Sequence, residues 1–539
     1  VAGKATIVRV YLKFPTAVEV RGQLQVARSV AGPWQTVPSL GTAQLDPARS
    51  GSTLAQLRSR RANLTFSLNF RLPPAVTTAG TLFLRMGPVQ RTTGTSLPSI
   101  AGLSVRNVTF RPAAPLRVRL VRMRYTMGTP ARTFEPTATD ATLFASWLRR
   151  AYPTDQLILS TSTATANVAP PFGAAQINAQ LIALRAVDVG TGTDGRTHYY
   201  GMVSDGGFFM RGLASGIPQT PQPGTVASGP TGPGTFGWDN DGSYGDWYGG
   251  HELGHTFGRF HAEFCGAIGG APYPFPNGQL SDADEAFVGI DVGDAALGLP
   301  LRLLGGVASH DVMTYCNNEW LSSFTYGGIY QRLVAENALP AGAGAGQGAE
   351  SVVIADAAAE SSGIRVIAAV NLTAASGTIT AVLPSAGDAE SERGDAAENS
   401  GASNVTLRVL DADGQVIDER PAAFLPSACE DPEDDVTGVV DTVLPAPPGQ
   451  ATVQLLVDGQ PVDSHPVGGA VAEVGALRGE EGAGLGRTPD GGLSLQWQTP
   501  DAPAGQRYIV QVSDDAGENW RTLAVGLAEP AVTISGDEL

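Results

Sequence analysis

Residues 251–261 read His-Glu-Leu-Gly-His-Thr-Phe-Gly-Arg-Phe-His, and this stretch decides how the middle of the chain folds. On a helix, His251 and His255 lie one turn apart on the same face, so both imidazoles can reach one metal ion. Gly258 then ends the helix, because glycine adopts a positive φ at little cost, and the turn brings His261 round as a third ligand. Three protein ligands leave a fourth position for water, which is typical of a catalytic zinc site.

Glu252 follows the first histidine, where its carboxylate would act as the general base toward the metal-activated water. Downstream, residues 311–316 read Asp-Val-Met-Thr-Tyr-Cys. Together the two stretches resemble the metzincin clan of zinc endopeptidases, whose signature is His-Glu-x-x-His-x-x-Gly-x-x-His followed by a methionine turn. The resemblance implies that Met313 forms an apolar floor under the histidines. It also implies that Tyr315 ligates zinc or hydrogen-bonds the oxyanion.

The resemblance implies an α+β catalytic domain and a secreted, bacterial type of enzyme, and it leaves the family within the clan open. Pappalysin-like enzymes are one option, because the pairs His261–Cys265 and Met313–Cys316 resemble theirs. Mucin-protease-like enzymes are the other, because they also carry β-sandwich modules around a metzincin core. The two motifs cover only a small part of the chain.

The other histidines do not form such a pattern. Only six histidines occur in 539 residues, and three of them fall in one short stretch with the glutamate and glycine in register, so coincidence is a poor explanation. His198, His310 and His465 are expected to be structural or to face solvent. His310, just before the methionine turn, is the one placed to contact the metal site indirectly.

The three cysteines are Cys265, Cys316 and Cys429. The first two flank the metal site in sequence, one after the third histidine and one after Met313, so we predict a disulfide between them. Such a bond implies an oxidising compartment. Two reduced core thiols are the alternative, and a cysteine ligand is disfavoured because three histidines already leave the needed vacancy. Cys429 has no evident partner.

The composition of the chain disfavours some classes of binding partner. The formal net charge is −17, which disfavours nucleic acid and anionic membranes as partners. No apolar run reaches the roughly 18 residues of a membrane span. No signal peptide begins at Val1, so we expect a processed or trimmed form. The preference for arginine over lysine, with abundant alanine and glycine, indicates a GC-rich bacterial genome.

The pattern along the chain predicts a multidomain protein with all-β sandwich domains around the α+β catalytic domain. Alternating polar and apolar residues predict an N-terminal β-sandwich in residues 1–114, before the catalytic domain in residues 115–340. A glycine- and alanine-rich stretch predicts a flexible linker at 341–350. Residues 351–470 are predicted to form another β-sandwich. Residues 471–539 resemble part of a fibronectin type III or immunoglobulin-like module.

Within the catalytic domain, mixed periodicities predict three strands and four helices. The strands are expected at 116–125, 157–161 and 198–203, and the helices at 139–152, 174–187, 245–257 and 326–337. The segment 225–228 is expected to be the edge strand, to which an extended substrate peptide adds by backbone pairing.

An acidic turn before the zinc helix is a candidate calcium site. It contains Asp239, Asn240 and Asp241, with Asp246 nearby. Its spacing does not match an EF-hand loop, and helix capping also explains acidic residues at this place.

Residues 317–321, after the methionine turn, are expected by resemblance to wall the pocket for the residue that follows the cut. Glu319 and Trp320 are the candidates, and Glu319 would favour a basic side chain; a solvent-facing glutamate is the alternative.

These features predict a secreted zinc-dependent endopeptidase that acts on extracellular proteins. Two alternatives stay open. One is a protease specific for glycoproteins such as mucins, with glycans bound by the accessory β domains. The other is an adhesin or carbohydrate-binding protein with a vestigial protease domain, which the intact Glu252 disfavours.

Overall fold

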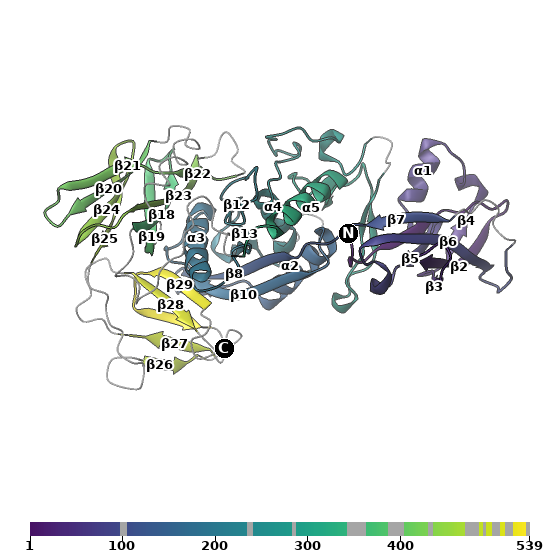
Figure 1. Ribbon diagram of the computed structural model, residues 1–539, viewed down its shortest axis with the longest axis horizontal. Coiled ribbons are helices and arrows are strands. Elements are labelled where there is room, and N and C mark those ends of the chain that lie inside the picture. Colours follow the sequence, from purple (N-terminus) through teal and green to yellow (C-terminus); the bar gives the residue numbers. More distant parts are fainter. Residues whose placement is uncertain are drawn as a thin grey trace.

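The computed structural model describes most of the chain, namely residues 1–97, 105–233, 241–282, 287–341, 363–385, 404–428, 435–468, 484–488, 492–497, 507–512 and 521–534. It is a β-rich, multi-sheet protein, in agreement with the β-rich, multidomain part of the predicted fold class. Its parts follow one another along the long axis, with the purple N-terminal sheets at one end and the green and yellow sheets at the other (Figure 1). The predicted linker lies outside the described residues, apart from Ala341.

The N-terminal part is antiparallel, as predicted. Its five-stranded sheet is built on β2 (Val18–Ala27), whose side chains alternate between the core and solvent. Strand β2 pairs with β3 (Gln35–Pro38), β4 (Ala43–Leu45) and β6 (Gly80–Arg91), and β7 (Arg106–Phe110) pairs with β6. Strand β1 (Ile7–Val10) pairs with β5 (Leu68–Arg71). Helix α1 (Leu54–Arg61), which begins with a capping box of Thr53 and Gln56, was not predicted.

The central part holds a six-stranded sheet with four parallel strands, in the order β10 (Leu157–Thr165), β8 (Leu116–Met127), β11 (His198–Ser204) and β13 (Ala227–Thr231). Strand β12 (Leu213–Ala214) runs antiparallel at the edge, and β9 (Arg132–Phe134) pairs with β8. Parallel strands need crossovers, which α2 (Ala138–Ala151) and α3 (Ala174–Gly190) provide. The prediction of an edge strand at 225–228 was wrong, because β13 is paired on both sides and β12 takes the edge.

Helix α4 (Gly245–Thr256) carries the first two histidines and packs closely on α2. Glycines make the close approach possible. A Cβ atom on Gly250 would lie 2.2 Å from the ring of Trp147, and one on Gly249 would lie 2.4 Å from the ring of Phe144. Both rings are fully buried, so neither can move aside. The histidine-bearing helix is therefore placed by the aromatic face of α2.

Short elements and one long helix complete the central part. They are β14 (Gly289–Asp291), β15 (Arg302–Leu304), β16 (His310–Asp311), β17 (Glu319–Trp320) and α5 (Ser323–Asn337). Among the helices that the structure describes, none has the length and apolarity needed to cross a membrane.

Two four-stranded antiparallel sheets packed face to face, which we call the sandwich, follow the central part. One sheet contains β19 (Ser376–Ser385), β18 (Gly363–Asn371), β23 (Thr437–Pro445) and β22 (Phe424–Pro426). The other contains β21 (Val416–Pro421), β20 (Val405–Asp411), β24 (Ala451–Val457) and β25 (Gln460–Val467). Apolar side chains from both sheets form a single core between them.

Helix α3 lies between the central sheet and the sandwich (Figure 1), and it is buried on nearly every face. Its residues Ile177 and Leu181 share one apolar cluster with Ile367 and Val439 of the sandwich. A helix that is buried on nearly every face is covered on nearly all sides, and here two domains supply the cover. The sandwich is therefore held against the central part by a common core.

The last described strands form two small sheets. One contains β26 (Gly484–Arg487), β27 (Leu493–Gln496) and β30 (Ala531–Ile534), and the other contains β28 (Tyr508–Val512) and β29 (Arg521–Leu527). The backbone N–H of Thr522 donates to the buried carboxylate of Asp188 on α3 at 2.9 Å. This region therefore also contacts α3.

The contact between α4 and α2 gives a first prediction. Gly250→Ala forces a Cβ atom against Trp147 and should lower the free energy of unfolding by about 1–3 kcal/mol. Gly327→Ala is the matched control, since its Cβ would meet nothing within 4 Å on α5, and it should stabilise the protein by about 0.5–1 kcal/mol. Urea denaturation measures both changes. Equal stability of the two variants would refute the close-packing argument.

Candidate metal centre

Three histidines converge as the sequence predicts. His251 and His255 come from consecutive turns of α4, and His261 follows the turn at Gly258, whose φ is +74°. Their candidate ligand atoms all lie within 4.8 Å of one another. The exposed fractions of the three side chains are 2%, 0% and 7%. The sequence is therefore folded into a buried three-nitrogen cluster that fits a metal ion.

The backbone orients each imidazole. Each ring donates its Nδ1 proton to a main-chain carbonyl: His251 to Val312 at 2.6 Å, His255 to Arg259 at 2.7 Å and His261 to Ile268 at 3.0 Å. Donation from Nδ1 leaves the Nε2 lone pair available as a ligand. The Nε2 atom of His261 is buried without a hydrogen-bond partner, although such an atom normally has one. A bound metal ion would satisfy it.

Burial keeps the cluster uncharged. It lowers the pKa of His251 to about 3 and also lowers the pKa of His255 and His261. Burial raises the pKa of Glu252 well above its usual value, and its Oε2 atom has no hydrogen-bond partner. Neutral imidazoles are the form that binds a metal, and a nearby cation would favour the ionised carboxylate.

The edge of the central sheet passes directly over Glu252. A Cβ atom on Gly212, just before β12, would lie 2.4 Å from Oε1 of Glu252 and 2.7 Å from the ring of Tyr248. Glycine is therefore required at this place if the carboxylate is to keep its position. Reasoning from the sequence missed Gly212, because nothing local distinguishes it from other loop glycines.

A cavity of about 1310 Å³ opens over the cluster, and we call it the metal-site cavity. His251, Glu252, His261 and Tyr315 line it on the metal side. Tyr315 is 45% exposed, and its ring centroid lies 4.9 Å from that of His261. Its position is suitable for the predicted contact with metal or substrate, while its chemical role stays a prediction.

Met313 lies under the histidine helix at the expected place. It is 1% exposed, and a Cβ atom on Gly254 would lie 2.6 Å from its sulfur atom. Asp311 fixes the turn by accepting hydrogen bonds from the backbone N–H groups of Met313 at 3.0 Å and Ser322 at 2.9 Å. The turn therefore supports α4 from below and also supplies the carbonyl of Val312 to His251.

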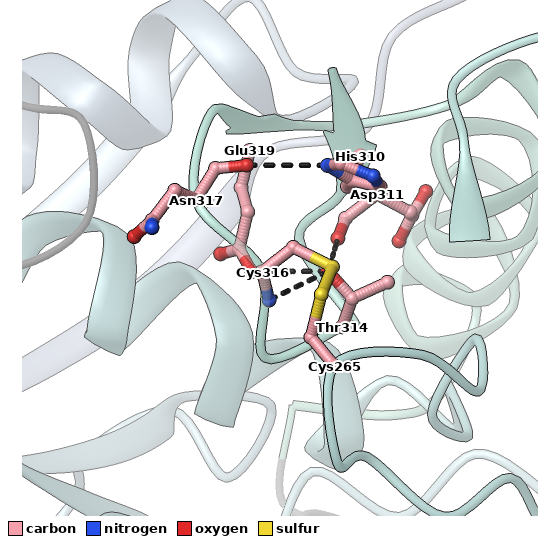
Figure 2. The surroundings of a disulfide bond; sticks show 7 residues. All are labelled: Cys265, His310, Asp311, Thr314, Cys316, Asn317 and Glu319. Carbon is pink, nitrogen blue, oxygen red and sulfur yellow. Dashed lines mark hydrogen bonds between the residues drawn. A yellow bond between two sulfur atoms is a disulfide. The ribbon is translucent and has the colours of Figure 1, made fainter. Parts of the chain in front are cut away.

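The predicted disulfide is confirmed. Cys265 and Cys316 are bonded, and Figure 2 shows the bond between the loop after His261 and the end of the methionine turn. The two segments that hold the third histidine and the floor of the site are thereby joined covalently. Cys429 lies outside the described residues.

Glu319 and Trp320 do not line the metal-site cavity, so the prediction that they wall a substrate pocket is not supported. Glu319 is 1% exposed and accepts a hydrogen bond from the Thr314 hydroxyl at 3.1 Å (Figure 2). Trp320 packs edge-on against Trp147. Both residues belong to β17, which pairs in parallel with β16, and both are buried. Of the expected segment, Asn317 does line the cavity.

The other histidines have structural contacts. His198 is buried and hydrogen-bonds Thr256 at the end of α4 and Glu336 on α5, at 3.0 and 2.8 Å. It therefore connects the histidine helix to α5. His310 donates its Nδ1 proton to the carbonyl of Asn317 at 3.2 Å.

The calcium prediction is not supported by the described part of the acidic turn. Asp239 and Asn240 lie outside the described residues. Among the residues that are described, the histidine triad is the one group of three or more potential metal-binding side chains, and Asp241 and Asp246 belong to no such group.

Comparison with known proteins does not assign the chain. No protein-family model matches its sequence. No curated protein matches it either. The site must therefore be interpreted from its own geometry.

Metal analysis tests the centre directly. We expect the purified protein to hold one equivalent of a divalent metal ion, and His255→Ala to lose it, because two histidines cannot replace three. His310→Ala should keep the metal, since His310 lies outside the cluster. Elemental mass spectrometry gives the stoichiometry and the identity of the metal. Full metal content in His255→Ala would contradict the assigned ligands.

Proposed function

We propose that this protein is a secreted zinc-dependent peptidase whose central part is a metzincin-like catalytic domain. The observation that carries the proposal is the position of Glu252, a buried carboxylate beside three converging imidazoles on the wall of an open cavity. Three neutral nitrogen ligands with a vacant side suit catalytic zinc. The disulfide supports folding in an oxidising compartment.

In hydrolysis, Glu252 and Tyr315 would have different roles. When bound, zinc supplies Lewis acidity to a water molecule and to the carbonyl that is attacked. Glu252 accepts the proton of the attacking water and then gives it to the leaving amine. Its burial raises its basicity, which favours the first of these steps. Tyr315, exposed beside His261, is placed to donate a hydrogen bond to the developing oxyanion.

The substrate would be an extended peptide. The Gly212 segment offers backbone groups at a sheet edge next to Glu252, and an edge of this kind binds a peptide strand by main-chain hydrogen bonds. A protease restricted to glycoproteins remains the closest alternative, since residues of the sandwich also line the metal-site cavity. An adhesin with a vestigial site is disfavoured, because the carboxylate and all three ligands are in place.

Replacing the base separates metal binding from hydrolysis. Glu252→Gln should lower the rate of casein cleavage by about 10²–10⁴-fold, because general base catalysis contributes an effect of that size. Its metal content should stay that of the wild type. Mass spectrometry of the casein fragments, with and without a chelator, measures both cleavage and its dependence on metal. Near-normal cleavage by the metal-loaded variant would exclude Glu252 as the base.

The glycine above the base gives a second test. Gly212→Ala places a methyl group where the Glu252 carboxylate lies, so kcat/KM should fall at least about tenfold, as expected for a displaced catalytic group. Metal content should be unchanged. Gly327→Ala, with open space around its Cβ, serves as the control and should keep full activity. Wild-type kinetics in Gly212→Ala would show that this contact does not position the base.

A further inference from the structure

The β-sandwich forms the far wall of the metal-site cavity. Besides the residues around the histidines, the cavity is lined by Asn371 of β18, Thr378 of β19, Thr437 at the start of β23 and Asp435 just before it. The common core with α3 holds this wall in place. Within the sandwich sheet, the ion pair between Arg365 and Asp441 crosses from β18 to β23. A substrate that fills the cavity would therefore also lie against the sandwich.

The sandwich also occupies part of the edge that a substrate would use. The backbone N–H of Ala428 donates to the carbonyl of Ala214 at 2.9 Å, in an antiparallel bridge. The backbone N–H of Ser215, the next residue, points into the sheet and donates to the carbonyl of Val226 at 2.8 Å. Because backbone groups alternate between the two edges of a strand, those of Gly212 face outward, like those of Ala214. Within the described residues, no hydrogen bond occupies the amide or carbonyl of Gly212.

This geometry limits how far a substrate can extend. A peptide that pairs antiparallel with Gly212 runs in the same direction as the segment at Ala428. Its residue two positions before the one opposite Gly212 would need the place that Ala428 holds. On its N-terminal side, the peptide can therefore continue by only one residue in the strand. A substrate must therefore either have its N-terminus at that residue or bend away from the sheet edge there.

Polar side chains surround the point where the pairing stops. Thr437 accepts a backbone hydrogen bond from Ser427, the neighbour of Ala428, at 3.0 Å. Thr437 is paired with Asn371 across the sheet, and the Asn371 amide donates to the Asp435 carboxylate at 2.8 Å. We call Asn371, Asp435 and Thr437, which line the cavity next to the segment that ends at Ala428, the closed end of the cavity. Apart from Glu252, Asp435 is the one carboxylate among the described residues that line the cavity.

We propose that the closed end binds a positively charged amine of the substrate, on the N-terminal side of the bond that is cut. The inference rests on the proposed peptidase function. An ammonium group fits because Asp435 supplies a negative charge, while Thr437 and Asn371 supply oxygen acceptors beside it. The amine is either the α-amino group of a substrate that begins there, or a lysine side chain of one that turns away.

Binding to an inactive variant tests this without hydrolysis. The zinc-loaded Glu252→Gln protein is incubated with pooled random-sequence hexapeptides, in free and in N-acetylated form, and the bound fraction is sequenced by mass spectrometry. The same experiment is done in the Asp435→Asn background. Asp413→Asn is the matched control, because Asp413 is an exposed carboxylate of the same sandwich and does not line the cavity.

If the α-amine is recognised, free peptides should bind about tenfold more tightly than acetylated ones, as expected for a charge-assisted hydrogen bond. If a lysine side chain is recognised, acetylated peptides that contain lysine should bind selectively instead. In either case Asp435→Asn should remove the preference and Asp413→Asn should keep it. Equal binding of free, acetylated and lysine-free peptides would overturn the proposal.

Measuring peptide cleavage together with peptide binding distinguishes a failure of this inference from a failure of the proposed function. Cleavage by the wild type without any preference for amines would retain the peptidase and refute the closed end as an amine site. An Asp435-dependent preference in binding, without cleavage by the zinc-loaded wild type, would retain the amine site and refute the peptidase.

Discussion

Three neutral imidazoles in a buried site are each held by one backbone carbonyl, and this constraint organises the centre of the molecule. The carbonyls come from the methionine turn, from the turn that ends α4 and from the loop after His261. Each of these segments must be fixed before the ligands can converge. Asp311 fixes the first, the positive φ of Gly258 shapes the second, and the disulfide ties the third to the turn. The residues around the site thus orient the imidazoles indirectly, by fixing the main-chain carbonyls that accept their hydrogen bonds.

Glycines are the second feature on which the packing around the metal site depends. Gly249 and Gly250 let α4 approach the aromatic face of α2, Gly254 makes room for Met313, and Gly212 makes room for Glu252. In each case a missing side chain allows a large or charged neighbour to come close. Loss of any of them would move the histidines or the base by more than a well-packed interior can absorb.

Much of this centre could be predicted from the sequence, because its determinants are local. The spacing of His251, His255, Gly258 and His261 specifies a helix and a turn, and the structure contains both. A disulfide between Cys265 and Cys316 could be predicted because both flank the metal site in sequence, and the structure contains it. What could not be predicted depends on contacts between distant segments. Glu319 is buried in β17, which pairs with β16, and the sheet edge belongs to β12 because β13 is covered on both sides. No sequence pattern indicated that α3 would share its core with the sandwich.

The shared core changes what the sandwich can do. A domain on a flexible linker could only bring a ligand near the metal site, whereas a domain packed on α3 takes part in shaping the metal-site cavity. Pairing at a sheet edge uses main-chain groups and therefore does not discriminate between sequences. Selectivity must arise where the pairing stops and side chains take over. In this protein that point is Ala428, with Asp435 and Asn371 beside it. Recognition of substrate would therefore depend on the sandwich as much as on the domain that carries the histidines.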